Sequence, residues 1–250
     1  MEISIAAEPL FHIGSFPVTN TLVVAVFITL IVLIASLILK NNLKKVPRGF
    51  QNIVEYVMEA FLNLTDSITQ NRKQTEKFFP IVMTIFIFVI LSNWVELMPG
   101  LGTIGIRENL HGKEILIPFL RSSSADLNVT IALALVSVFS VQFMGIATIG
   151  VVKYAKKFFI SPFHKPYFIG TFVGILEIVG EVSRIISYAF RLFGNIFAGE
   201  VLLIVMLNLV PYIVPLPFLF LEMFVGFVQA LVFSMLTIVF LKIGTMEAEH

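Results

Sequence analysis

The sequence predicts an all-α polytopic membrane protein, with about five membrane helices and one amphipathic helix at the membrane surface. Hydrophobic residues make up 58% of the 250 residues and charged residues only 13%, against a usual charged share of about 25%. The mean hydropathy is +0.96. A soluble chain of this length could not hide so much apolar surface. Lipid is the expected solvent, and only helices or closed barrels satisfy every backbone hydrogen bond there.

The composition also excludes several classes of function. The net charge is +1 and the basic residues form no nucleic-acid-binding pattern, so no nucleic-acid partner is expected. The absence of cysteine excludes disulfides, thiol catalysis and thiolate-bound metals. No phosphate loop or metal-ligand spacing appears, so we expect no cofactor, no metal and no catalytic site of its own. The histidines all lie outside the predicted membrane segments, which argues against a haem between helices: His12, His111, His164 and His250.

Long apolar runs predict the membrane helices within a single integral membrane domain, 1–250. The first run, 21–39, would span about 28 Å at about 1.5 Å per residue, close to the thickness of the hydrocarbon core. No Lys or Arg precedes Lys40, so a retained helix after an outer arm, 1–20, is expected rather than a signal peptide. The last two helices are long, so we expect them to tilt. The other four runs are 78–97, 127–152, 167–209 and 216–243.

An amphipathic helix is predicted over 48–70. Its apolar residues recur at intervals of three and four, with Glu55, Glu59 and Asp66 between them, which is typical of a helix with one wet face. A basic cluster around Lys44 precedes it, which favours a helix lying in the membrane interface. A soluble connecting helix is the alternative.

Lysine and arginine are distributed unevenly between the two sides of the predicted bundle. Segments 40–77 and 153–165 carry seven and four of them, whereas 98–126 carries three and 1–20 carries none. Because positive loops remain in the cytoplasm, the N-terminus is expected outside and the C-terminus inside. No internal repeat is apparent, which argues against a transporter built from paired halves.

Six ionisable residues lie inside the last two apolar segments. An arginine at a helix centre costs about 2.5–3.5 kcal/mol on insertion scales, so such residues face protein or water and are candidates for function. Residues seven apart share a helix face, as do Glu177, Arg184 and Arg191. A structural ion-pair cluster is the alternative near the inner side, because an acid three residues before Arg184 can pair with it. The six are Glu177, Glu181, Arg184, Arg191, Glu200 and Glu222.

Arg191 has no acidic residue within one turn of its own helix. The positions three and four residues away hold Ser187, Tyr188, Gly194 and Asn195. Since a guanidinium stays charged, we expect a partner from another chain. Snorkelling of the side chain to the membrane surface is the alternative.

Glu200 lies nine residues after Arg191 and therefore faces the opposite side of the helix. On the last helix Glu222 and Gln229 share a face, with Gly226 between them leaving room. If the last two helices are antiparallel, Glu200 and Glu222 approach near the outer side. Two such carboxyls titrate as a coupled pair, which suits a proton relay. Plain interhelical hydrogen bonding is the alternative.

A polar run, 122–126, comes directly before the third membrane segment. Helix capping by Ser124 or Asp126 is the favoured interpretation. The alternative places Asp126 in an aqueous vestibule on the outer side.

The run 191–200, Arg-Leu-Phe-Gly-Asn-Ile-Phe-Ala-Gly-Glu, resembles the characteristic motif of subunit a of the F-type ATP synthase in its bacterial form. Segments 124–130, 229–233 and 236–239 agree with the same family. The order, the spacing and the five-helix layout match over nearly the whole chain, with the N-terminal third matched mainly by pattern.

The resemblance implies a proton-translocating stator subunit of the Fo sector in a bacterial plasma (inner) membrane. Such a subunit offers two offset half-channels to the membrane carboxylates of a rotating c-subunit ring. The b-subunit peripheral stalk and the other ATP synthase subunits are further implied partners, besides the lipid bilayer. A secondary ion or solute transporter and a membrane assembly protein are the rival hypotheses.

The resemblance also assigns roles to residues. Arg191 matches the arginine that keeps the ring carboxylate charged and blocks a proton short circuit. Some members carry His where this chain has Glu222, so an imidazole relay at that position is excluded here. The positions that match half-channel residues are Asn195, Glu200, Glu222 and Gln229, and further candidates are Asp126, Glu177 and Ser187.

Overall fold

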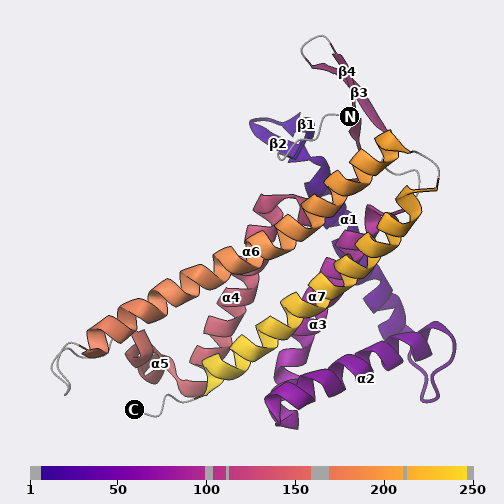
Figure 1. The fold of residues 1–250 in the computed structure, drawn as a ribbon. Coiled ribbons are helices and arrows are strands. Elements are labelled where there is room, and N and C mark those ends of the chain that lie inside the picture. The colour runs from indigo at the N-terminus through magenta and orange to yellow at the C-terminus, as the bar shows by residue number, and fades with distance from the viewer. Residues whose placement is uncertain (1–6, 99–103, 111–112, 159–168, 211–212, 247–250) are drawn as a thin grey trace.

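The computed structural model describes residues 7–98, 104–110, 113–158, 169–210 and 213–246 (Figure 1). Five helices in this part of the chain are long and apolar enough to cross a membrane, which confirms the predicted all-α polytopic class. They are α1 (Asn20–Asn41), α3 (Arg72–Val95), α4 (Leu127–Ile149), α6 (Ile169–Leu209) and α7 (Pro215–Thr245).

Two further helices lie at the end of the bundle opposite the α6–α7 connection (Figure 1). The predicted amphipathic helix is α2 (Phe50–Thr69), whose Phe61, Thr65 and Thr69 are buried while most of its other residues are exposed. The short α5 (Val151–Phe158) was not predicted. It follows Gly150, whose φ of +91° is a backbone conformation that favours glycine.

The second membrane helix, α3, begins earlier than its hydropathy suggested, at Arg72 rather than at residue 78. Asn71 caps it, because its side-chain oxygen accepts a hydrogen bond from the Lys73 amide at 3.1 Å. The helix therefore passes through Pro80 and includes a polar first turn. Hydropathy marks where the apolar part of a helix begins, whereas the cap marks where the helix itself begins.

Two antiparallel hairpins lie at the other end of the bundle, near the connection between α6 and α7 (Figure 1). The first joins β1 (Pro9–Ile13) to β2 (Phe16–Thr19), and the second joins β3 (Gly105–Leu110) to β4 (Lys113–Pro118). Neither hairpin was predicted from the sequence. Each is a short two-stranded pair attached to a helical bundle, and such a pair gives too weak a periodic signal to detect.

The core lies between α3, α4, α7 and one face of α6. Its fully buried members include Val82, Leu192 and Ile238. Glycines allow close approach between helices, since a Cβ on Gly244 would lie 2.9 Å from Val141, as small residues commonly do in membrane bundles. Ser137 and Thr237 also share a buried hydrogen bond of 2.8 Å.

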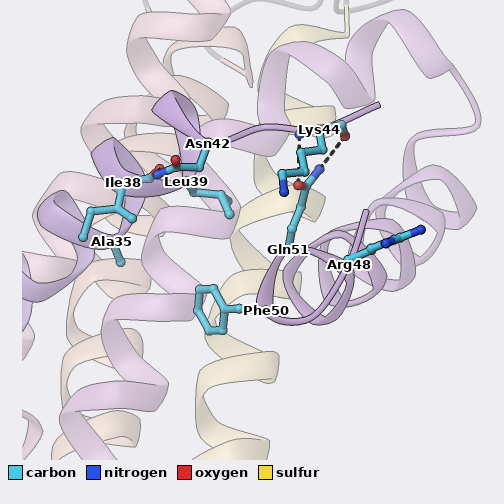
Figure 2. Close-up of a pocket in the computed structure, with 8 residues that line it drawn as sticks. All are labelled: Ala35, Ile38, Leu39, Asn42, Lys44, Arg48, Phe50 and Gln51. Atoms are coloured by element: carbon cyan, nitrogen blue, oxygen red, sulfur yellow. Dashed lines mark hydrogen bonds between the residues drawn. The ribbon is translucent and has the colours of Figure 1, made fainter. Parts of the chain in front are cut away.

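The turn from α1 into α2 is fixed by Gln51 (Figure 2). Its side-chain amide accepts from the Lys44 N–H at 3.1 Å and donates to the Lys44 carbonyl at 2.9 Å. A cavity of about 350 Å³ lies beside this turn, between the last turns of α1, Phe50 and the Lys44 side chain. The chain therefore enters the amphipathic helix through a defined, basic corner.

Candidate functional site

A buried ion pair joins α6 to the segment that precedes α4. The Arg121 guanidinium donates to one oxygen of Glu200 from two nitrogens, Nη2 at 2.9 Å and Nε at 3.2 Å. The two side chains are only 6% and 14% exposed. Hydrogen bonds between charged groups are stronger than neutral ones, so this contact holds the C-terminal part of α6 against the segment that precedes α4.

Glu222 on α7 packs against the backbone of α6 at the residue before Glu200. A Cβ on Gly199 would lie 1.6 Å from the Oε2 atom of Glu222, so the carboxyl takes the space that a larger residue at position 199 would need. Glu222 is buried, at 8% exposure, and interacts electrostatically with Glu200. The predicted approach of these two carboxyls across α6 and α7 is therefore present in the structure.

Glu96, which follows the last residue of α3, completes an assembly that we call the outer charge cluster, where outer means only the end of the bundle near the α6–α7 connection: Glu96, Arg121, Glu200 and Glu222. The Glu96 carboxyl accepts from the Ser122 backbone and interacts electrostatically with the other three members. Neither Arg121 nor Glu96 was predicted from the sequence as a site residue. The available signal was an arginine and a glutamate beside predicted membrane segments on the side that is poor in basic residues.

Side-chain hydrogen bonds from the end of α3 to the backbone of α7 lie next to this cluster. Asn93 donates to the Gly226 carbonyl at 3.0 Å, and Trp94 donates to the Met223 carbonyl at 3.1 Å. A Cβ on Gly226 would lie 3.0 Å from that of Asn93. The room that Gly226 was expected to leave is therefore occupied by Asn93.

Asp126 caps α4, in agreement with the favoured interpretation. Its Oδ1 atom accepts from the Asn128 amide at 2.9 Å, and its Oδ2 atom accepts from the Thr21 hydroxyl at 2.8 Å. The residue is buried, at 6% exposure. These contacts tie the start of α4 to the start of α1.

Arg191 lies on the outward face of α6. Ser187, Gly194 and Asn195 around it are exposed, whereas the next residue along the helix, Leu192, is buried. Its guanidinium donates to the Ser187 hydroxyl at 3.2 Å. Among the residues that the structure describes, no carboxylate pairs with Arg191, so its charge is not neutralised within this part of the chain.

The N-terminal part of α6 carries the ion-pair cluster that was the alternative to a functional role. Arg184 bonds Glu181 at 2.6 Å and lies 3.9 Å from Glu177. Its guanidinium also stacks over the Phe240 ring, 4.4 Å from the centroid, as cations commonly do. Gln229 is partly exposed on α7, and no described side-chain hydrogen bond joins it to another site residue.

These features define the class of the protein: a helical membrane protein in which one long helix contributes to a buried charge cluster and carries, on its other face, an arginine that no described carboxylate neutralises. Comparison with known proteins then places it. The family model described as ATP synthase A chain matches residues 20–242. The chain therefore belongs to this family, subunit a of the F-type ATP synthase.

Individual relatives agree along the whole length. The chain is 33% identical to ATP synthase subunit a of Campylobacter jejuni subsp. jejuni serotype O:23/36, over 96% of this chain and 90% of the relative. It is 30% identical to ATP synthase subunit a of Campylobacter fetus subsp. fetus, over 100% and 99%. It is also 30% identical to the same subunit of Moorella thermoacetica, over 93% of each chain.

Proposed function

We propose that the chain is the stator subunit that conducts protons to and from the c-subunit ring, with Arg191 as the fixed charge between two half-channels. The observation that supports this most directly is the exposed position of Arg191 on α6. A guanidinium within an apolar segment needs a counter-charge, and the described part of the chain supplies none to it. A carboxylate on a neighbouring ring subunit meets that requirement.

The two faces of α6 then serve different purposes. Arg191, Asn195 and Ser187 lie on the face directed toward the ring. Glu200 and Glu222 belong to the buried outer charge cluster and line the outer half-channel. Glu177, near the other end of α6, and Gln229, on α7, are the candidates for the remaining polar path, whereas Asp126 has a structural role in the cap.

The energetics favour arginine at position 191. A proton that crosses 100 mV is worth about 2.3 kcal/mol, and a direct leak between the half-channels would dissipate it. Because the guanidinium does not lose its proton, it blocks that leak and releases the ring carboxylate only as the ring turns. The chain itself then needs no catalytic site or cofactor.

The test is proton flux in vesicles that contain the whole reconstituted complex. Arg191→Ala should abolish ATP-driven pumping while the complex still assembles, and it should permit a passive leak. Arg191→Lys should not restore full activity, because an ammonium lacks the planar fork of the guanidinium. Arg72→Ala is the matched control, since Arg72 forms an exposed pair at the α2–α3 corner. Pumping near the original rate in Arg191→Ala would overturn the mechanism.

The proposed orientation places the N-terminus outside and the C-terminus in the cytoplasm of a bacterial plasma membrane, where the b-subunit stalk and other subunits bind. The basic corner between α1 and α2 would then face the cytoplasm. Single cysteines at Gly112 and Thr245 can be labelled from either side of intact cells. Labelling of both from one side would contradict the five-crossing topology.

A further inference from the structure

The cavity at the turn from α1 into α2 combines an apolar wall with a basic rim (Figure 2). Ala35 and Ile38 contribute to the wall from the last turns of α1, and Phe50 lies opposite them at the start of α2. Lys44 and Arg48, from the segment that joins the two helices, line the rim. The volume of about 350 Å³ lies within the range of small-molecule sites, about 300–1,000 Å³. The cavity therefore suits a ligand with one apolar part and one anionic part.

The positive charge at this corner exceeds what the described part of the chain neutralises. Four basic side chains lie within nine residues, and all four are exposed: Lys40, Lys44, Lys45 and Arg48. Among the residues that the structure describes, none of the four forms an ion pair with a carboxylate. Glu55 is the acidic side chain that the described contacts bring to the corner, where it accepts from the Gln51 amide at 2.7 Å. The corner therefore retains an excess of positive charge that an anion would balance.

The backbone of Lys44 is fixed in place, whereas its ammonium is free to bind. Gln51 is buried, at 8% exposure, and its amide bonds both the N–H and the carbonyl of Lys44. No described side-chain hydrogen bond involves the ammonium itself. Arg48 extends outward from the rim (Figure 2), and exposed side chains change rotamer within nanoseconds, so it can turn toward an anion. A preformed turn of this kind lowers the entropic cost of binding.

The apolar wall continues along α1 as a stripe on one face of the helix. Ile31, Ala35, Ile38 and Asn42 follow one another at steps of four, three and four residues, which places them on the same face. Ile31 and Ile38 are 43% and 58% exposed. The stripe 31–42 is about 16 Å long at about 1.5 Å per residue, which is close to half the thickness of the hydrocarbon core. One acyl chain of a phospholipid has the same reach.

These dimensions favour a lipid over a segment of another protein. A sphere with the volume of this cavity would be about 9 Å across, narrower than a helix with its side chains, at about 10–12 Å. Only 11% of the apolar part of α1 is buried within the chain, so its surface is open to lipid. A free phosphate ion would leave the apolar wall unfilled. Basic pockets beside membrane helices bind anionic lipid headgroups.

We propose that this corner is a binding site for one anionic phospholipid, with its phosphate held at the rim by Lys44 and Arg48 and one acyl chain along the 31–42 stripe of α1. Lys40 and Lys45 add to the attraction. The bound lipid fills the cavity and links α1 to the amphipathic α2. The site involves neither Arg191 nor the transported proton, so its test is independent of the proposed function.

The test uses the whole complex in phosphatidylcholine vesicles that contain a trace of photoreactive lipid. Two probes carry the same photoreactive acyl chain, one on phosphatidylglycerol and the other on phosphatidylcholine. Mass spectrometry of the peptides gives the corner ratio, which is the label from phosphatidylglycerol divided by that from phosphatidylcholine on residues 31–50. The corner ratio should be higher than the same ratio measured on α4, because the two probes differ only in the charge of the headgroup.

Variants identify the groups that hold the headgroup. Lys44→Gln combined with Arg48→Gln should lower the corner ratio by about 25-fold, about fivefold for each cation. Lys73→Gln combined with Lys77→Gln is the matched control and should leave it unchanged. Both control lysines are exposed at the start of α3, beyond the far end of α2, whose 20 residues span about 30 Å. Ile38→Trp retains every charge but fills the cavity, and should lower the corner ratio by a smaller factor.

Three results would overturn the proposal: an unchanged corner ratio in the Lys44 and Arg48 variant, an equal loss in the control pair, or removal of the label by inorganic phosphate. The second would indicate attraction to surface charge in general, and the third a site for a free anion. Absence of both labels from residues 31–50 would show that another subunit covers the corner, and would overturn it as well.

The unaltered complex provides a second measurement in case the Lys44 and Arg48 variant does not assemble. Unlabelled phosphatidylglycerol, added to the vesicles, should displace the phosphatidylglycerol probe from residues 31–50 while its labelling of α4 changes little. Equal displacement from both regions would contradict a specific site.

Discussion

Two arginines, one in contact with α6 and one on it, differ in their surroundings. Near the C-terminal end of α6, Arg121 from the segment before α4 reaches Glu200 in a buried pair within the outer charge cluster. Arg191 lies nine residues before Glu200, on the opposite face of α6. It is exposed and bonds only a serine among the described residues. The charge of Arg121 is buried against its partner, whereas the charge of Arg191 is left at the surface.

The largest expected difference between the two sites is in stability. Arg121→Ala leaves Glu200 buried without its partner and should lower the free energy of unfolding by about 3–5 kcal/mol. Arg191→Ala removes an exposed side chain and should change it by no more than about 0.5 kcal/mol. Thermal unfolding in detergent, followed by the fluorescence of the single tryptophan, compares them. Equal losses would show that Arg191 is also part of the chain's own architecture.

Two glycines on α6 sharpen the same comparison. Gly199→Ala places a Cβ against the Glu222 carboxyl, which must rotate aside, and should cost about 0.5–1.5 kcal/mol through the displaced rotamer. At Gly194, beside Arg191, a Cβ meets nothing within 4 Å, so Gly194→Ala should stabilise the helix by about 0.5–1 kcal/mol. Unfolding of both variants in detergent tests the signs, and a stabilised Gly199→Ala protein would contradict the packing of Glu222.

The cap at Asp126 tests whether the outer end of the bundle is held together by more than its charge cluster. Asp126→Ala removes the bonds to the Asn128 amide and the Thr21 hydroxyl and should cost about 1–2 kcal/mol. Thr21→Val removes only one of them and should cost less. Proton flux in the assembled Asp126→Ala complex should persist. Complete loss of flux with normal assembly would support a vestibule role for Asp126.

The smallest effect is expected at the exposed corner between α2 and α3. The Thr75 hydroxyl and the Arg72 guanidinium lower the pKa of Asp66 below its usual 3.8. A carboxyl with a lowered folded-state pKa stabilises the fold above its unfolded pKa, and that contribution disappears as the pH falls through the folded pKa. Asp66→Asn should therefore slightly lower stability at neutral pH and remove this part of the acid dependence.

Unfolding of Asp66→Asn and of Glu59→Gln should be followed from neutral pH into the acid range. Glu59 lies exposed on the same helix, and its substitution should leave the acid dependence unchanged. The same acid dependence in both variants would show that the contact between Asp66 and Arg72 contributes nothing measurable.

Sequence reasoning succeeded where one physical requirement dominates. Each of the five apolar runs became a helix, because lipid leaves the backbone no other partner. The ends were less accurate: the Asn71 cap moved the start of α3 into a polar segment, and α5 is too short for a periodic pattern. The approach of Glu200 to Glu222 could be predicted, because helical spacing and an antiparallel pair of helices constrain the faces on which these residues lie.

The sequence by itself determined the solvent, the number of crossings and the residues that could not be lipid-facing, since the cost of exposing a charge to hydrocarbon is set by chemistry alone. Only the tertiary structure decided which charge neutralises which. Arg121 and Glu200 are 79 residues apart, and Glu96 joins them from a third segment. No periodicity relates such positions, because their contact depends on how separate helices and loops pack at one end of the bundle.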